Sequence, residues 1–256
     1  MLVATWNVNS LKVRLPHLLT WLGQAQPDVV GLQEIKCLDE GFPVAELRDA
    51  GYHSAFAGQK TYNGVAVLSR EPIEDVVTDL PGFLDPQRRV LGCTIGDLRF
   101  LNLYVPNGQE VGSDKYLYKL DWLQALEEFC RDEMKAHPSF CVVGDFNIAP
   151  DERDVHDPDA WQGQVLFSEP ERDAFNRLVG LGLVDTFRLF DQEGGNYSWW
   201  DYRMGAFRRN RGLRIDHVLA SKSLAERCMG VTIDVEPRTW NRPSDHTPVV
   251  ARFSPP

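Results

Sequence analysis

Short apolar segments recur along this chain, and most of them end abruptly at polar or turn-forming residues. Segments bounded in this way predict buried β-strands. They cover residues 2–6, 28–32, 52–57, 64–69, 90–95, 99–105, 140–144, 215–220 and 248–253. Asn107-Gly108, a strong turn signal, follows one of them. The pattern therefore predicts strands over the whole length of the chain.

Apolar residues at helical spacing predict helices between these strands. Leucines recur at positions 11, 15, 18, 19 and 22, and Pro27 stops this first helix. A second helix is predicted over residues 116–134, where apolar residues recur at 117, 120, 123, 126 and 129. Ser168 and Glu171 have the spacing of a capping box, which indicates a third helix start.

The order of these elements predicts a layered α/β fold. Strands and helices are interspersed without a low-complexity linker or a short-period repeat, which favours two sheets with helices outside them. A chain of 256 residues can bury one large core, so we expect a single domain over residues 1–256. The stretch 149–167 has few apolar residues and many acids, and it is interpreted as a long surface loop.

The composition is that of an ordinary globular protein, with 43% apolar and 25% charged residues. No apolar run approaches the roughly 20 residues that span a bilayer, and the N-terminus lacks the features of a signal peptide. The five cysteines are scattered without zinc-binding spacing, which fits a reducing compartment. We expect a cytoplasmic protein that does not bind membranes.

A net charge of −10 argues mildly against a general binder of polyanions, but basic residues gather in one stretch. Arginines and aromatic residues alternate there, at Trp199, Trp200, Tyr202, Arg203, Phe207, Arg208, Arg209, Arg211 and Arg214. Such a stripe can bind nucleic acid on an acidic protein, because salt confines the field of a charge to about 10 Å. The alternative is a solvated loop whose aromatic residues are anchored in the core.

Polar residues with catalytic potential follow several of the predicted strands. Gly144-Asp145-Phe146-Asn147 comes directly after a strand, and alternate residues of an extended chain share a face, so Asp145 and Asn147 are expected to point the same way. Similar groups at other strand ends are Asn7, Asn9, Gln33, Glu34, Tyr104, Asp216, His217, Ser244, Asp245 and His246. Each group alone could simply shape a turn, but together they predict one site built from many strand ends.

The residue types in these groups favour metal-assisted hydrolysis of a phosphate ester. Carboxylates and carbonyl oxygens select hard cations such as Mg²⁺ or Mn²⁺. Neutral amides donate hydrogen bonds to anionic oxygens without adding charge, and a histidine held by an acid can stabilise an oxyanion. The chain contains neither a glycine-rich phosphate loop nor a GxSxG nucleophile motif.

In order along the chain, these groups resemble the exonuclease III type of AP endonuclease, within the endonuclease/exonuclease/phosphatase superfamily. The matching motifs span nearly the whole sequence. They are Trp6-Asn7-Val8-Asn9, Leu32-Gln33-Glu34-Ile35-Lys36, Asn63-Gly64-Val65-Ala66, Leu103-Tyr104-Val105-Pro106-Asn107-Gly108, Gly144-Asp145-Phe146-Asn147, Tyr197-Ser198-Trp199-Trp200, Leu213-Arg214-Ile215-Asp216 and Ser244-Asp245-His246.

The resemblance implies a four-layered α/β sandwich, in which two packed mixed β-sheets are flanked by helices. It implies Mg²⁺-dependent hydrolysis of the phosphodiester 5′ to abasic sites in duplex DNA, with Mn²⁺ able to substitute. It also implies 3′→5′ exonuclease and 3′-end trimming activities and a monomeric enzyme. The relative strength of these activities and the number of bound metal ions are left open.

The resemblance also implies a role for each matching residue. Asp145 would activate water, and Asn147 would hold Asp145 and touch the phosphate. Tyr104 would contact the scissile phosphate or share in stabilising the leaving group. His246, paired with Asp216, would stabilise the phosphoryl oxygens. The expected metal-binding residues are Glu34, Asn7, Asn9 and Asp245. The expected substrate-binding residues are Trp199 and Leu213 at the abasic sugar and Arg203, Arg208, Arg209 and Arg211 at the DNA backbone, with Arg214 in the same stretch and Lys36, Lys115 and Lys119 as weaker candidates.

Two departures from the eukaryotic pattern accompany this resemblance. Asn9 stands where those enzymes carry an acid, and Leu213 stands where they carry Trp. Two competing hypotheses are a superfamily phosphatase acting on inositol phosphates or sphingolipids, and a nuclease relative that only binds. The extended aromatic and basic stretch argues against the first, and the complete set of polar residues argues against the second.

Overall fold

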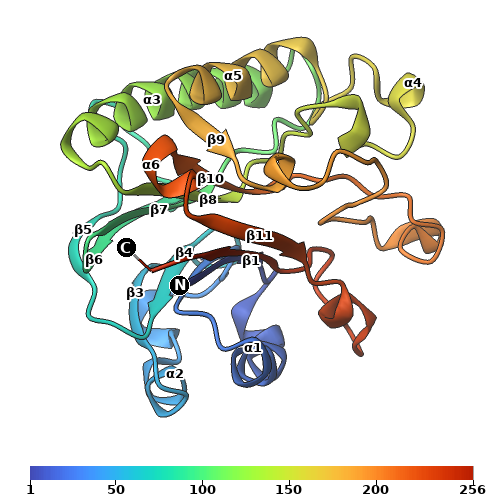
Figure 1. The fold of residues 1–256 in the computed structure, drawn as a ribbon. Helices are drawn as coiled ribbons and strands as arrows, with labels where there is room; N and C mark the ends of the chain where they lie inside the picture. Colours follow the sequence, from blue (N-terminus) through green and yellow to red (C-terminus); the bar gives the residue numbers. More distant parts are fainter. Residues whose placement is uncertain (256) are drawn as a thin grey trace.

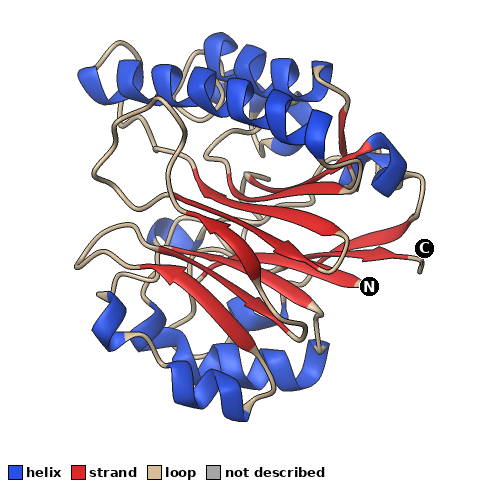
Figure 2. Ribbon diagram, turned by 90° about the vertical axis from the view of Figure 1, so that its left-hand side faces the viewer, coloured by secondary structure: helices blue, strands red, loops and turns tan. Residues whose placement is uncertain are grey.

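The computed structural model describes residues 1–255, which form two facing β-sheets covered by helices on their outer sides (Figures 1 and 2). The first sheet has the strand order β11 (Cys228–Ile233), β12 (Val249–Phe253), β1 (Leu2–Asn7), β2 (Val29–Gln33), β4 (Val65–Ser69) and β3 (His53–Ala57). The second has the order β5 (Glu74–Val77), β6 (Val90–Ile95), β7 (Leu98–Tyr104), β8 (Phe140–Asp145), β10 (Asp216–Ser221) and β9 (Leu183–Asp185). The predicted four-layered sandwich of mixed sheets is confirmed.

Helices form the two outer layers. The first sheet carries α1 (Leu11–Ala25) and α2 (Val44–Asp49), and the second carries α3 (Asp114–Ala136) and α5 (Glu169–Gly180) (Figure 1). Two single-turn helices are α4 (Pro158–Trp161) and α6 (Lys222–Ala225). The short 3₁₀ turns are η1 (Asp39–Gly41), η2 (Glu152–Asp154), η3 (Phe187–Leu189), η4 (Arg203–Gly205) and η5 (Glu236–Thr239). No helix within residues 1–255 combines the length and apolar composition that a membrane crossing requires.

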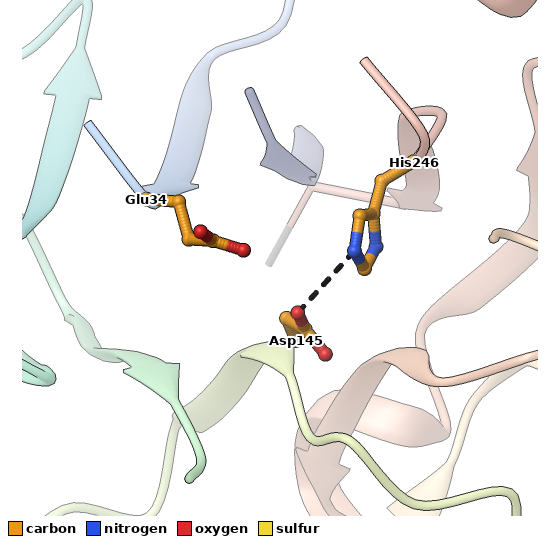
Figure 3. A group of neighbouring side chains, drawn as sticks. All are labelled: Glu34, Asp145 and His246. Atoms are coloured by element: carbon orange, nitrogen blue, oxygen red, sulfur yellow. Dashed lines mark ion pairs between the residues drawn. The ribbon is translucent and has the colours of Figure 1, made fainter. Parts of the chain in front are cut away.

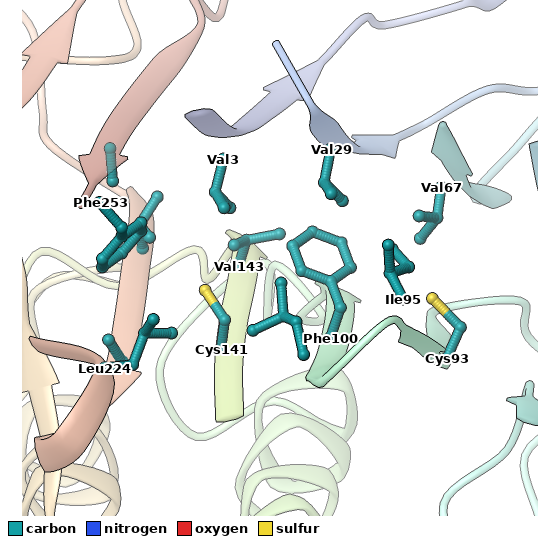
Figure 4. Packing of buried hydrophobic residues seen from close by; sticks show 14 of the residues in the cluster. Val3, Val29, Val67, Cys93, Ile95, Phe100, Cys141, Val143, Leu224 and Phe253 are labelled. Atoms are coloured by element: carbon teal, nitrogen blue, oxygen red, sulfur yellow. The ribbon is translucent and has the colours of Figure 1, made fainter. Parts of the chain in front are cut away.

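The core lies in three layers, which explains why the central strands read as almost continuous apolar runs. Side chains such as Val3, Val29, Phe100 and Val143 pack between the sheets (Figure 4). Separate clusters fill the space between each sheet and its helices. A strand that is buried on both faces must be apolar on both, unlike a strand with one face in water.

Two parallel strand pairs at the centre of the sheets bring the polar strand ends together. β1 pairs with β2 and β7 pairs with β8 in parallel, whereas the other strand pairs are antiparallel. Asn7, Tyr104 and Asp145 therefore all stand at the carboxyl ends of central strands. Strand β10 runs the opposite way and begins at Asp216, directly opposite Asp145. The residues that were predicted at strand ends therefore lie together at one edge of the sandwich.

The predicted strands are confirmed with small shifts at their ends, but three strands were not predicted. These are β5, β9 and β11, and each lies at the edge of its sheet. Most residues of β5 and β11 are partly or fully exposed, β5 begins with two acids, and β9 has only three residues. Edge position alone did not decide the outcome, because the edge strand β3 was predicted over residues 52–57.

The interpretation of residues 149–167 as a surface loop was wrong in part. The segment contains η2 and α4 and begins and ends in the core. Ala149, Val155, Leu166 and Phe167 are buried in one cluster. A few apolar residues suffice to anchor a segment when each of them is buried.

Candidate functional site

Asp145 is the last residue of β8, and its buried carboxylate is held by two hydrogen bonds. Its Oδ1 accepts from the backbone N–H of Asn147 at 2.9 Å, and its Oδ2 accepts from Nδ2 of Asn7 at 2.9 Å. The residue before it must be glycine, because a Cβ on Gly144 would lie 2.1 Å from the carbonyl oxygen of Leu103. This close approach of β7 and β8 helps to place the carboxylate.

Asn147 supports Asp145 in a different way from the one predicted. The strand ends at Asp145, and Asn147 has a left-handed backbone with φ of 49°, so the two residues are not alternate positions of one strand. The support comes from the backbone N–H of Asn147, while its side-chain Nδ2 donates to the carbonyl oxygen of Val105 at 2.9 Å. Asn tolerates this conformation better than most residues do.

Asn7 joins two carboxylates that belong to different sheets. Its Nδ2 donates to Oε1 of Glu34 at 2.8 Å and to Oδ2 of Asp145 at 2.9 Å. Because the amide is neutral, it holds both acids without adding another negative charge. Figure 3 shows Glu34, Asp145 and His246 facing one another across the edge of the sandwich.

His246 lies between two acids. Its Nδ1 is 2.8 Å from Oδ2 of Asp216, and its Nε2 is 3.5 Å from Oδ2 of Asp145. Burial opposes the charge on the imidazole, but the carboxylates of Asp216 and Asp145 outweigh it and raise the pKa of His246 to about 10. The protonated ring can therefore donate a hydrogen bond at neutral pH.

The same surroundings make Asp145 an unusually basic carboxylate. Burial raises its pKa to about 7, the positive charge of His246 partly offsets this effect, and the acids Asp216 and Glu34 add to it. A carboxylate whose pKa lies near the working pH is suited to accept a proton from water.

The donor atoms at this edge fit a hard divalent cation. Carboxylate oxygens of Glu34 and Asp145 lie within 4.8 Å of each other and of a ring nitrogen of His246. Because that ring is protonated, the carboxylates are the groups that can bind a cation. Two carboxylates brought so close repel each other, and a cation between them would relieve that repulsion. Oxygen donors predominate in the group, as Mg²⁺ and Mn²⁺ prefer.

Asn9 and Asp245, two of the expected metal-binding residues, lie beside this group. Nδ2 of Asn9 donates to Oδ1 of Asp245 at 3.0 Å. Nζ of Lys36 donates to Oδ1 of Asn9 at 2.6 Å and pairs with Oε2 of Glu34 at 3.0 Å. Lys36 thus contacts the candidate metal-binding residues directly, although the sequence indicated only a weak DNA contact for it.

Tyr104 ends β7 next to the acids and is held by an arginine that the sequence did not single out. The guanidinium of Arg89 lies 4.8 Å from the centre of the Tyr104 ring, and its Nη1 donates to the Tyr104 carbonyl at 3.1 Å. Burial and the nearby carboxylates of Glu34 and Asp145 raise the pKa of Tyr104 well above its usual value. The phenol therefore remains a hydrogen-bond donor. The sequence before β6 carried no spacing that marked Arg89.

Trp199 and Leu213, expected at the abasic sugar, lie together beside the acids. Their backbones form an isolated bridge, and Trp199 forms another with His246. Nε1 of Trp199 donates to Oδ2 of Asp245 at 3.0 Å. Leu213 is completely buried in a cluster with Leu166 and other apolar residues, so the expected direct contact of its side chain with the abasic sugar was wrong.

The predicted basic stripe is only partly a surface feature. Arg208, Arg209 and Arg211 are exposed, and Arg203 is exposed but paired with Asp201 at 3.1 Å. A DNA-contact role for Arg214 was wrong, because this residue is 1% exposed and is held by acids. Its guanidinium binds Asp154 at 2.6 Å and Asp185 at 2.7 Å.

The weaker prediction that Lys119 contacts DNA was also wrong. This residue is completely buried and pairs with Glu171, which is completely buried too. The capping box predicted at Ser168 and Glu171 is confirmed, because Oε2 of Glu171 accepts from the N–H of Ser168 at 3.1 Å.

Comparisons with known proteins agree with this geometry. The model of the endonuclease/exonuclease/phosphatase family matches residues 4–246. Exodeoxyribonuclease III of Haemophilus influenzae is 36% identical over 262 residues, which cover 97% of this chain and 98% of that protein.

Two solved structures are similar over almost their full length. The 3′ phosphatase NExo from Neisseria, bound to a product DNA hairpin, is 46% identical with a TM-score of 0.98, and the match covers 99% of each chain. An AP endonuclease from Archaeoglobus fulgidus is 38% identical with a TM-score of 0.96, and the match covers 100% of each chain. The chain therefore belongs to the endonuclease/exonuclease/phosphatase family, and within it to the exodeoxyribonuclease III group.

Proposed function

We propose that this protein is a DNA-repair nuclease that hydrolyses the phosphodiester 5′ to abasic sites in duplex DNA and also trims 3′ ends. One observation carries the proposal. The raised pKa of Asp145 makes it a suitable base, and it lies between Glu34 and a protonated His246. The names of the relatives, which include exodeoxyribonuclease III and AP endonuclease, support DNA as the substrate.

In the proposed reaction Asp145 accepts a proton from the attacking water, and the water oxygen bonds to phosphorus. The phosphorus–oxygen bond to the preceding nucleotide breaks, and the departing sugar oxygen takes up a proton from solvent. The N–H of Asn147 and the amide of Asn7 keep the Asp145 carboxylate oriented during this reaction. His246 donates a hydrogen bond to a phosphoryl oxygen as negative charge develops, and Asp216 stabilises the imidazolium. Tyr104 donates a hydrogen bond to the phosphate or to the departing sugar oxygen.

Glu34 would hold a Mg²⁺ ion through its carboxylate, and Mn²⁺ can substitute for it. Asn7 would contribute through its Oδ1, which in this structure accepts from the N–H of Asn9 at 2.9 Å. When bound, the cation supplies Lewis-acid polarisation of the phosphate and neutralises part of its charge. Asn9 and Asp245, which are hydrogen-bonded to each other, would lie beside the bound cation. Lys36 would hold the Asn9 side chain by donating to its Oδ1.

Trp199, which packs against the apolar cluster that contains the buried Leu213, would contact the sugar at an abasic site, and Arg203, Arg208, Arg209 and Arg211 would contact the DNA backbone. Extruding a nucleotide that has no base requires little loss of pairing and stacking. All these side chains come from one chain, so we expect the enzyme to act as a monomer.

The test is a nicking assay on three substrates: a duplex with one abasic analogue, a nicked duplex with a 3′ phosphate and a duplex with matched 3′ ends. With Mg²⁺ we expect an incision 5′ to the abasic analogue together with 3′-end trimming, and EDTA should stop both. Folded protein that cleaves none of the three would contradict the proposal. Processing of 3′ ends without incision would limit the function to 3′-end repair, the kind of activity for which the 3′ phosphatase NExo is named.

A further inference from the structure

A charged lysine is buried directly beneath the candidate site. Lys119 lies on α3 and is completely buried. Its ammonium group donates to the carbonyl oxygen of Asn147 at 2.7 Å, to that of Asn107 at 3.1 Å and to Oε1 of Glu171. An ammonium group has three hydrogens to donate, and these three acceptors use them all.

Glu171, the partner of Lys119, also binds several groups of the chain. It lies in the first turn of α5, and its carboxylate accepts from the backbone N–H of Leu166 at 3.0 Å and from that of Ser168 at 3.1 Å. It accepts from the Ser168 hydroxyl as well, and this hydroxyl lies 2.6 Å from that of Tyr116 on α3. The buried ion pair is thus fully hydrogen-bonded.

Three segments around the site meet at this ion pair. Asn107 follows β7, Asn147 follows β8, and Leu166 lies near the end of the segment 149–167. The contact at Asn147 matters most for chemistry, because the N–H of the same residue donates to Asp145. Asn147 has a φ of 49°, and Lys119 holds the carbonyl that leaves this left-handed residue. The carbonyl and the N–H of Asn147 lie in neighbouring peptide units joined at its Cα, so a shift of that atom when the contact with Lys119 is lost would weaken the hydrogen bond to Asp145.

Stability alone does not account for a buried ion pair of this kind. Burying two charges carries a desolvation penalty, and replacement of such a pair by apolar residues of similar volume is often neutral or stabilising. We propose that Lys119 and Glu171 are positioning residues that hold Asn147 and Asn107 in the arrangement that orients Asp145. This role rests on the proposed function, in which Asp145 activates water.

The test separates positioning from stability with three variants: Lys119→Met, Glu171→Leu and the double variant that carries both. Each single variant leaves one buried charge without its partner, so its Tm should fall. The double variant should regain most of the lost Tm. Its kcat on the abasic duplex should nevertheless stay about 10- to 100-fold below that of the wild type, with KM changed by less than about 3-fold, because small misplacements cost this much in rate.

A second ion pair on the same helix provides the matched control. Arg99 at the start of β7 pairs with Glu133 near the end of α3, at the other end of this helix from Lys119. Arg99→Met should lower the Tm and leave kcat unchanged. A folded double variant with wild-type kcat would overturn the proposal, as would an equal loss of kcat in Arg99→Met.

Backbone amide exchange tests the same idea without any activity. The Asn147 amide, which donates to Asp145, should exchange faster in the double variant and at the wild-type rate in Arg99→Met. Unchanged protection in the double variant would contradict the positioning role. If the wild type cleaves no DNA, the proposed function fails, and the exchange measurement still decides whether Lys119 and Glu171 position Asn147.

Discussion

At the scale of single residues, the site is organised around neutral groups that hold acids. Asn7 and the N–H of Asn147 both donate to Asp145, and neither carries a charge. Acids so close together would otherwise repel each other and the phosphate of DNA. The one positive side chain in contact with Asp145 is His246, within residues 1–255, and Asp216 keeps it protonated. The result is a basic carboxylate that is nevertheless well oriented.

We predict that Asp145→Asn lowers kcat by about 10²- to 10⁴-fold, the range for loss of a general base. The amide has nearly the same shape as the carboxylate but cannot accept the proton from water. The fold should be retained, because the substitution removes a buried charge. Single-turnover cleavage of an abasic duplex measures the effect, with the exposed residue Asp132 changed to Asn as the control. Near-full activity of Asp145→Asn would assign the base to another group.

At the scale of elements, the segment 199–211 combines a buried aromatic side with an exposed basic side. Trp200 is buried, and its ring packs against that of Phe207 with centroids 5.0 Å apart. Arg208, Arg209 and Arg211 remain in solvent and form no ion pair within residues 1–255. The anchored aromatics hold the segment while its arginines stay available for phosphate contacts. The two interpretations of this stripe, an anchored loop and a DNA surface, are therefore compatible.

We predict that Arg209→Ala weakens binding to duplex DNA and reduces the salt dependence of that binding. Each lost phosphate contact should lower the slope of log K against log salt by about 1, because fewer counterions are released. Binding titrations at several salt concentrations on uncleaved DNA measure the slope. Arg131→Ala is the control, because this exposed arginine on α3 pairs with Glu127. Equal slopes for Arg209→Ala and the wild type would count against a DNA contact.

At the scale of the whole molecule, the two sheets supply different parts of one site, so their relative placement matters. Asn7 and Glu34 come from the first sheet, and Tyr104, Asp145 and Asp216 come from the second. A buried cluster of polar residues around Arg214 also stabilises the second sheet. In this cluster His217 accepts from Arg214 at 3.1 Å and donates to the carbonyl of Ile148 at 2.9 Å.

His217 should make global stability depend on pH. Burial, together with the positive charge of Arg214, lowers its pKa from 6.5 to about 4. Between these values the unfolded chain binds the extra proton and the folded protein does not. The contribution of His217 to the free energy of unfolding is therefore fully present above pH 6.5. It falls as the pH drops toward 4 and stays constant below that pH.

Between pH 6.5 and pH 4 the free energy of unfolding should fall by about 3 kcal/mol because of His217, at about 1.4 kcal/mol per pKa unit. Urea unfolding at a series of pH values measures it in the wild type and in His217→Gln, which lacks the titrating group. The carboxylates titrate in both proteins, so the difference between the two slopes of unfolding free energy against pH gives the contribution of His217 alone. Parallel curves for the two proteins would refute the assignment.

The sequence by itself determined the layered fold and most of the site. Buried central strands require apolar side chains, and polar groups at their ends stand out against that background, which is how Glu34, Asp145, Asp216 and His246 were found. Family motifs then supported their roles. Three of the four edge strands, β5, β9 and β11, were missed because a short or partly exposed strand leaves little pattern.

Only the tertiary structure decided what the charged residues contact. Lys119 and Arg214 resembled surface cations in sequence, yet each is buried against acids that lie more than 25 positions away in the chain. The left-handed turn at Asn147 likewise depends on contacts from two other segments. A linear pattern reports whether a position tends to be buried, but the partner that makes a buried charge stable comes from elsewhere in the fold.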